Sequence, residues 1–270
     1  MTQIIIITDL DGTLLHPVTY SFDEALPALE LIRARRIPLV LCSSKTRAEI
    51  ETYRARLENR DPFVSENGGG VFIPEGYFHF PVEGELRNEY RVITLGRPYS
   101  EVREVFRDVQ KRAGIAIRGF GDMDAVEVAR IAGMELSDAE MAKERDFDEP
   151  FLFEEGEKRG GVFLKAVEEA GLHWTQGRFY HILGDHDKGK AVKILKGYYE
   201  RARGDVKTIG LGDSFNDLPL LKSVDYPVLV QKEDGSYEER IALPHLIKAR
   251  GIGPAGWNEA VMALIRGISR

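Results

Sequence analysis

The chain has 270 residues, of which 43% are hydrophobic and 30% charged, so it is long enough for one large or two smaller domains and is too apolar for a disordered chain. Its formal net charge of −7 argues against a nucleic-acid or anionic-membrane partner, because either would favour a concentrated basic face. The only cysteine, Cys42, excludes an intrachain disulfide and fits a reducing compartment. With no basic leader and no long apolar run, we expect a cytoplasmic protein that has no membrane partner.

Short, nearly continuous apolar runs predict parallel strands that are covered on both faces. They are "QIIIIT" (3–8), "IPLVLC" (37–42), "VKTIGLG" (206–212) and "YPVLV" (226–230). Helices are expected near 22–35 and 47–58, where Ser21 with Glu24 and Thr46 with Glu49 fit capping boxes. This alternation predicts an α/β fold with a Rossmann-like parallel-sheet core.

The middle of the chain does not continue the alternation and is expected to form an inserted α+β domain. Its predicted elements are strands at 89–95 and 178–183, helices at 100–114 and 157–170, and a capping box from Ser137 to Glu140. Further helices are expected at 187–202 and 253–268. We therefore expect a core made of residues 1–82 and 186–270, with an insertion at 83–185.

Polar residues follow the predicted core strands. Asp9 and Asp11 follow the first strand, "SSKT" (43–46) the second, Lys188 the return from the insertion, and "GDSFND" (212–217) the next strand. The carboxyl ends of parallel strands meet at one edge of a sheet, where ligands bind in such folds. Four separate segments are therefore predicted to build one site.

This set of groups suits phosphoryl transfer through an aspartate. Asp9 could attack phosphorus, and Asp11, two residues on in extended geometry, could donate and accept protons. The hard oxygens of Asp9, Asp213 and the Asp11 backbone carbonyl suit Mg²⁺. Ser43 and the helix that follows would bind phosphate, while Lys188 would offset negative charge.

The four segments resemble the motifs of the haloacid dehalogenase superfamily of phosphatases. They are "DLDGT", the serine after the second strand, the lysine after a long insertion, and "GDSFND". The position of the insertion resembles that superfamily's α+β cap, which is implied to close over the substrate and set specificity. Four finer stretches are similar to the mannosyl-3-phosphoglycerate phosphatase family: "SSKT", "SENGGGVF" (65–72), "KERDFDEPF" (143–151) and "GRFYHILGDHDKGKAV" (177–192).

The resemblance implies a Mg²⁺-dependent phosphomonoesterase that hydrolyses mannosyl-3-phosphoglycerate, a small phosphorylated sugar-glycerate, to the compatible solute mannosylglycerate. The implied catalytic residues are Asp9 and Asp11. The phosphate-binding residues would be Ser43, Ser44, Lys188 and Asn216. The metal-binding residues would be Asp9, Asp11, Asp213 and Asp217. Lys45, Asn67, Arg178 and His181 are candidate substrate contacts.

Three other interpretations fail at single residues. "GDHDKGKA" (184–191) nearly spells a Walker A loop, but Ala191 lacks the hydroxyl that would hold Mg²⁺. An EF-hand loop from Asp9 would need glutamate where Tyr20 stands. "CSSKTR" (42–47) is followed by Ala48, where a cysteine phosphatase would need arginine.

Three alternatives stay open for the whole protein: a phosphatase for glucosyl-3-phosphoglycerate or another sugar phosphate, a phosphomutase, and a non-catalytic binding module. Arg178 and His181 could equally serve local packing, and "KERDFDEPF" could be a salt-bridged turn. The sequence assigns no oligomeric state.

Overall fold

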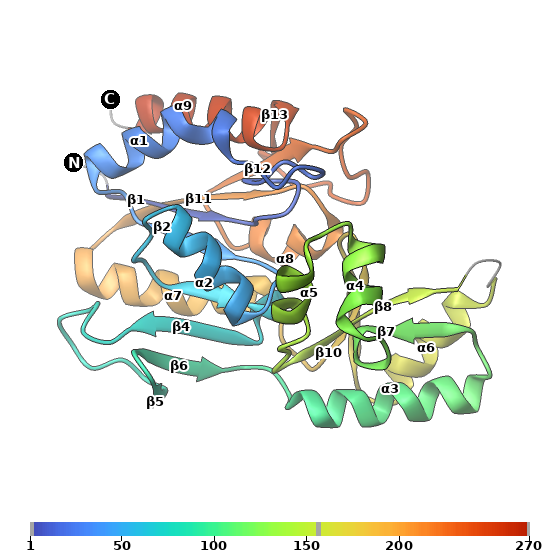
Figure 1. The fold of residues 1–270 in the computed structure, drawn as a ribbon. Helices are drawn as coiled ribbons and strands as arrows, with labels where there is room; N and C mark the ends of the chain where they lie inside the picture. The colour runs from blue at the N-terminus through green and yellow to red at the C-terminus, as the bar shows by residue number, and fades with distance from the viewer. Residues whose placement is uncertain (1–2, 155–157, 269–270) are drawn as a thin grey trace.

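The computed structural model describes residues 3–154 and 158–268, and a nine-stranded sheet forms its larger part (Figure 1). The strand order is β13-β12-β11-β1-β2-β3-β4-β6-β5. The pairs from β13 to β3 are parallel, and the remaining pairs, from β3 to β5, are antiparallel. The bounds are β1 Gln3–Thr8, β2 Leu39–Cys42, β3 Phe63–Ser65, β4 Gly70–Pro74, β5 Glu85–Arg87, β6 Tyr90–Thr94, β11 Val206–Gly212, β12 Tyr226–Gln231 and β13 Ile247–Ile252.

Helices cover both faces of this sheet, which explains why β1 is apolar at almost every position. The covering helices are α1 Leu26–Arg35, α2 Arg47–Arg56, α7 Lys188–Arg203, α8 Leu218–Leu221 and α9 Pro254–Ile268. Ile4 and Ile6 of β1 pack on the side of α1, α2 and α9, while Ile5 and Ile7 pack on the side of α7 and α8. Alternate side chains of a strand point to opposite faces, so a doubly covered strand needs an unbroken apolar run.

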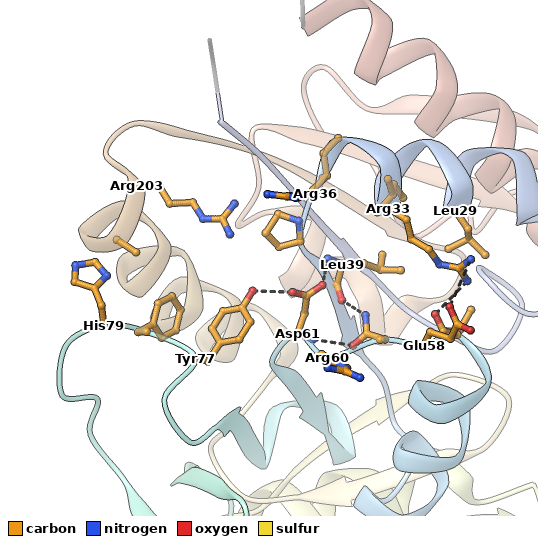
Figure 2. Close-up of a pocket in the computed structure, with 17 residues that line it drawn as sticks. Leu29, Arg33, Arg36, Leu39, Glu58, Arg60, Asp61, Tyr77, His79 and Arg203 are labelled. Atoms are coloured by element: carbon orange, nitrogen blue, oxygen red, sulfur yellow. Dashed lines mark hydrogen bonds and ion pairs between the residues drawn. The ribbon is translucent and has the colours of Figure 1, made fainter.

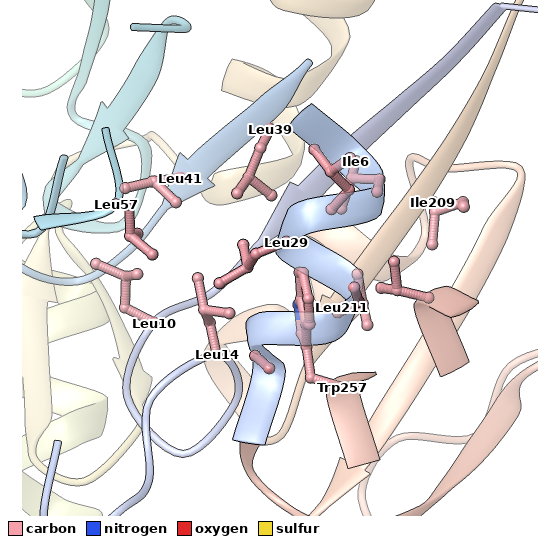
Figure 3. Packing of buried hydrophobic residues seen from close by; sticks show 14 of the residues in the cluster. Ile6, Leu10, Leu14, Leu29, Leu39, Leu41, Leu57, Ile209, Leu211 and Trp257 are labelled. Atoms are coloured by element: carbon pink, nitrogen blue, oxygen red, sulfur yellow. The ribbon is translucent and has the colours of Figure 1, made fainter. Parts of the chain in front are cut away.

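Figure 3 shows the first of these two layers. Ile6, Leu39, Leu41, Ile209 and Leu211 lie on the sheet beneath Leu29 of α1, and Trp257 of α9 packs into the same cluster. The Trp257 indole is fully buried and donates a hydrogen bond of 2.9 Å to the Thr8 hydroxyl. This packing fixes the carboxyl end of β1, from which Asp9 and Asp11 follow.

A second, four-stranded antiparallel sheet has the order β7-β8-β10-β9 (Figure 1). Its strands are β7 Ile117–Gly119, β8 Asp148–Phe153, β9 His173–Gln176 and β10 Tyr180–Leu183. The helices beside it are α3 Tyr99–Ala113, α4 Ala125–Ala132, α5 Leu136–Ala142 and α6 Gly160–Glu169. α3 and α6 share an apolar cluster with this sheet, and α4 and α5 form a separate one.

The hairpin β5–β6 lies inside the range 83–185 that was expected for the insertion, yet it extends the large sheet. β6 pairs with β4 over five residues, from Gly70 with Thr94 to Pro74 with Tyr90. The second sheet and its helices therefore occupy only residues 95–185, and this segment is called the cap below. The α/β class, with a parallel core and an inserted α+β unit, is confirmed.

Two of the three expected capping boxes do not form. Thr46 and Glu49 form theirs at the start of α2. The Ser21 hydroxyl accepts a hydrogen bond from Asp23 N at 3.0 Å, but the turn before α1 begins after Phe22. Ser137 lies within α5, whose N-cap is Glu135, so the box predicted from Ser137 to Glu140 is wrong. No helix in the described part of the chain is long and apolar enough to cross a membrane.

Candidate active site

The predicted site residues gather at the carboxyl ends of β1, β2 and β11. A cavity of about 490 Å³ opens there between the core and the cap. Its lining includes Asp9, Asp11, Ser44, Lys45, Asp213 and Asn216 from the core and Arg145, Arg178 and His181 from the cap. The core and the cap thus both contribute polar side chains to one cavity.

Lys188, the first residue of α7, joins the turns after β1 and β11. Its Nζ lies 2.7 Å from Asp9 Oδ1 and 2.7 Å from Asp217 Oδ1, and its side chain is fully buried. Burial of an ammonium is costly unless carboxylates surround it. Here the two carboxylates raise the pKa of Lys188 far above its usual range against the opposing effect of burial, so the lysine is charged.

Asp213 is held in place by short polar side chains. The Thr13 hydroxyl donates to Asp213 Oδ1 at 3.0 Å, and the Ser214 hydroxyl donates to Oδ2 at 2.8 Å. Gly12 has a φ of 74°, and a Cβ at this residue would lie 2.7 Å from Asp213 Oδ2. The glycine of "DLDGT" is therefore required both by the backbone conformation and by the closeness of Asp213.

One carboxylate oxygen each from Asp9, Asp213 and Asp217 fall within 4.8 Å of one another. Burial, followed by the nearby Asp217 carboxylate, raises the pKa of Asp213 to about 7. Burial likewise raises the pKa of Asp9, although Lys188 opposes this. Three carboxylates face the single positive charge of Lys188, so a bound divalent cation would balance the remaining negative charge. Mg²⁺ prefers oxygen ligands of this kind.

Asp11 faces Lys45, which the loop after β2 brings beneath it. Lys45 Nζ lies 3.0 Å from Asp11 Oδ2 and 3.2 Å from Glu49 Oε1. Glu49 also accepts a hydrogen bond from Thr46 N at 2.9 Å as part of the capping box of α2. Lys45, which the sequence predicts as a substrate contact, lines the cavity and is bound to these two carboxylates.

The remaining predicted residues differ in how they meet the cavity. Ser43 is fully buried and accepts a hydrogen bond from Lys45 N at 3.3 Å, whereas its neighbour Ser44 lines the cavity. Asn67 does not line it, but connects Asn216 (3.0 Å) to Asp148 (2.9 Å). Arg178 lies at the exposed rim and donates to the Tyr20 hydroxyl at 2.7 Å.

His181 lines the cavity from β10 and is oriented by a buried carboxylate. Its Nδ1 lies 3.0 Å from Asp148 Oδ2, while Arg145 Nη1 lies 2.8 Å from Asp148 Oδ1. His181 and Arg145 lower the pKa of Asp148 against the effect of burial, so this carboxylate is charged. Neither Asp148 nor Arg145 was singled out from the sequence, although both stand in the stretch "KERDFDEPF".

Figure 2 shows a second cavity, of about 560 Å³, near the amino ends of β2 and β3. Asp61 accepts hydrogen bonds there from Leu39 N at 2.8 Å and from the Tyr77 hydroxyl at 2.7 Å. Arg36 follows the last residue of α1, and Arg203 ends α7. Basic side chains at helix C-termini favourably oppose the helix dipole, so their presence needs no ligand. The described lining of this cavity includes none of the predicted site residues.

Comparison with known proteins shows that the sequence of this chain is similar to that of phosphatases. Residues 6–78 match the model of the haloacid dehalogenase-like hydrolase family. A glucosyl-3-phosphoglycerate/mannosyl-3-phosphoglycerate phosphatase from Methanococcoides burtonii is 49% identical over 97% of both chains. A protein with the same name from Persephonella marina is 43% identical over 98% of both chains. A haloalkanoate (HAD) superfamily phosphatase from Bacteroides thetaiotaomicron has a similar fold, with a TM-score of 0.66 and 17% identity over 98% of this chain and 95% of that one.

Proposed function

The chain belongs to the glucosyl-3-phosphoglycerate/mannosyl-3-phosphoglycerate phosphatase family of haloacid dehalogenase-like hydrolases, and from this premise we propose that it hydrolyses mannosyl-3-phosphoglycerate to mannosylglycerate and phosphate. Glucosyl-3-phosphoglycerate is proposed as a second substrate, because both of the relatives described above carry both substrates in their names. The observation that carries the proposal is that Asp9 and Asp11 line one cavity shared by core and cap, and that the buried Lys188 binds Asp9 from behind this lining.

The proposed reaction has two steps through Asp9. Lys188 holds Oδ1 of Asp9, which leaves Oδ2 to attack phosphorus while the bond from phosphorus to the glycerate oxygen breaks. Asp11 gives a proton to the departing oxygen. A water molecule then attacks the phosphorus of the aspartyl-phosphate and gives its proton to Asp11. The bond to Asp9 breaks, and inorganic phosphate leaves.

The surrounding groups would stabilise the charge that moves in these steps. Asp9, Asp213, Asp217 and the backbone carbonyl of Asp11 would hold Mg²⁺, which when bound offsets the charge of the phosphoryl oxygens. Ser43, Ser44 and Asn216 would hold the phosphate oxygens near the start of α2, whose N-terminus favours anions.

The cap would select the rest of the substrate. Arg178 is hydrogen-bonded to a neutral Tyr20 hydroxyl, so its charge is available for the glycerate carboxylate. His181 would contact a sugar hydroxyl from β10, and Asn67 would hold Asn216 and Asp148 in place beneath it. We propose that residues 95–185 form this specificity domain and that residues 3–94 and 186–268 form the catalytic core.

The test is release of inorganic phosphate by the purified protein with Mg²⁺. Mannosyl-3-phosphoglycerate, glucosyl-3-phosphoglycerate, 3-phosphoglycerate and hexose phosphates would be compared, with EDTA and Asp9→Asn as controls. The proposal expects both sugar-glycerate esters to be preferred and both controls to abolish release. A preference for hexose phosphates would overturn the substrate, and full activity of Asp9→Asn would overturn the mechanism.

A further inference from the structure

A row of charged side chains with alternating sign runs from Asp11 in the core to Asp148 in the cap. Lys45 Nζ lies 3.0 Å from Asp11 Oδ2 and 3.2 Å from Glu49 Oε1. Glu49 Oε2 lies 3.9 Å from Arg145 Nη2, and Arg145 Nη1 lies 2.8 Å from Asp148 Oδ1. Apart from Asp11, whose side chain is 33% exposed, every side chain in this row is at most 6% exposed.

Helix capping does not explain why Lys45 is buried in this row. The Glu49 carboxylate completes the capping box through Oε2 and the Thr46 backbone, which leaves only Oε1 for Lys45. The rings of Tyr20 and Tyr53 lie 5.3 and 5.6 Å from Lys45 Nζ and confine it. A buried ammonium loses its water and must be stabilised by its partners. Both carboxylate partners, Asp11 and Glu49, line the cavity, but Glu49 is already engaged by the capping box of α2, whereas Asp11 is the proposed proton donor.

The two oxygens of Asp11 differ in their surroundings. Oδ2 is bound to Lys45, whereas Oδ1 is buried and has no hydrogen-bond partner among the described residues. An ion pair on one oxygen holds the carboxylate in one orientation, and proton transfer is efficient only when the group is correctly aimed.

We propose that Lys45 is a positioning residue, which holds the Asp11 carboxylate in the orientation needed for proton transfer to the leaving oxygen. This inference rests on the proposed function. Glu49 fixes Lys45 from the core, and Arg145 extends the row into the cap. Arg145 also donates a 2.8 Å hydrogen bond to the Ser44 carbonyl, next to Lys45 in the chain. The position of Asp11 is thereby tied to the packing of the cap against the core.

The leaving group provides a readout that a purely structural role would not change. The alkyl oxygen of a sugar-glycerate phosphate needs a proton as it leaves, whereas the nitrophenolate of 4-nitrophenyl phosphate leaves without one. For Lys45→Met, kcat/KM should fall about 100-fold with the alkyl ester, at the lower end of general acid contributions, but less than about 10-fold with 4-nitrophenyl phosphate. Lys45→Arg should recover most of the loss.

Controls separate positioning from folding. Lys45→Met alone leaves the Glu49 carboxylate without its lysine partner. The double variant Lys45→Met/Glu49→Gln removes that charge and keeps a side chain that can cap α2, so it should restore stability but not activity with the alkyl ester. Lys165→Met removes an exposed lysine with the same i,i+4 spacing to a glutamate, Glu169. This variant should change neither the stability of the protein nor kcat/KM with either ester.

The outcomes are distinguishable from failure of the proposed function. If the wild-type protein releases phosphate from neither ester, the phosphatase proposal fails. If the wild-type protein is active but Lys45→Met and the double variant lose activity equally with both esters, or lose none, the role of Lys45 is overturned. For a wild-type protein that prefers another alkyl phosphate, that ester replaces the sugar-glycerate in the comparison.

Discussion

Lys188 Nζ lies 2.7 Å from Asp9 Oδ1, although 179 positions separate the two residues in the sequence. The same ammonium binds Asp217, so one buried lysine connects the turns that follow two neighbouring strands of the sheet. The nucleophile proposed here is thus held by a residue that the chain supplies only after it returns from the cap.

Replacing Lys188 with methionine should abolish most phosphate release and destabilise the protein. The loss of one charged donor at the phosphoryl site should lower kcat by about 100-fold or more. Breaking the buried pair should cost about 3–5 kcal/mol of unfolding free energy, measured by urea denaturation. The double variant Lys188→Met/Asp217→Asn removes one of the two carboxylates that lose their lysine partner. It should recover part of the stability that Lys188→Met loses but should not recover phosphate release. Near-normal activity in either variant would contradict the assigned role.

Arg178→Met should affect substrates that carry a carboxylate. We expect the KM for mannosyl-3-phosphoglycerate to rise about 10-fold or more, because a charge-assisted hydrogen bond of roughly 1.5–3 kcal/mol is lost. Glucose 6-phosphate has no carboxylate, so its KM should stay within about twofold of the wild-type value. This limit corresponds to about 0.4 kcal/mol of binding free energy. Tyr20→Phe is the matched control, because it removes only the hydroxyl that Arg178 contacts. An equal rise for both esters would show that Arg178 does not read the carboxylate.

Glu66 attaches the core to the cap, and its loss should destabilise the protein. Its carboxylate accepts hydrogen bonds from the backbone N–H groups of Asp146, Phe147 and Asp148, at 2.8 to 3.1 Å. In Glu66→Ala these donors lose their acceptor, which should cost about 3 kcal/mol or more in chemical denaturation.

The matched surface change for Glu66→Ala is Glu75→Ala, which removes an exposed partner of Arg91. It should cost less than about 1 kcal/mol. Equal small effects of the two substitutions would mean that the attachment at Glu66 contributes little to stability.

Glu238 should make stability depend on pH in the acid range. Hydrogen bonds from Arg240, followed by Lys232, lower the pKa of Glu238 to about 2, below the ordinary 4.5. Because the pKa of Glu238 is lower in the folded protein than in the unfolded chain, the ionised carboxylate stabilises the folded state. This contribution is complete above pH 4.5 and is lost as the pH falls from 4.5 toward 2.

The corresponding experiment compares wild type with Glu238→Gln by urea denaturation between pH 7 and pH 3. The variant should be less stable by about 1.5–3 kcal/mol at pH 7, and the difference should shrink as the pH drops. Asp234→Asn, at an exposed residue whose carboxylate accepts hydrogen bonds from Ser236, is the control. A difference that does not change with pH would rule out the ion pair as its source.

The gathering of Asp9, Ser44, Lys188 and Asp213 could be predicted because parallel strands deliver their following residues to one sheet edge. The roles of Asp9, Lys188 and Asp213 follow from their chemistry and from the family resemblance, that of Ser44 from the resemblance alone, and all of them stay predictions. The periodicity of a strand does not show which sheet the strand joins. Residues 89–95 were therefore predicted correctly as a strand, but they were assigned to the insertion, whereas they pair with β4 of the large sheet.

Other features depended on contacts that are distant in sequence. Arg145 and Glu66 act through partners on the other side of the core–cap boundary, and no local pattern marks those pairs. The ion pairs of Lys45 with Asp11 and Glu49 could not be predicted from its own segment, and its expected contact with substrate stays a prediction. The strands β3, β4, β5, β7, β8, β9 and β13 were not predicted, since runs that are brief, exposed or interrupted by glycine, proline or charged residues resemble loops.

The central claim is that Asp9 carries the phosphoryl group, and covalent trapping tests it most directly. The protein would be mixed with mannosyl-3-phosphoglycerate and Mg²⁺, quenched within one turnover, and treated with borohydride, which reduces an aspartyl-phosphate to homoserine. Peptide mass spectrometry should find homoserine at residue 9 in the wild-type protein and none in Asp9→Asn. Reduction at Asp11 or Asp213 instead, or none during full turnover while an acyl-phosphate standard is reduced, would contradict the account.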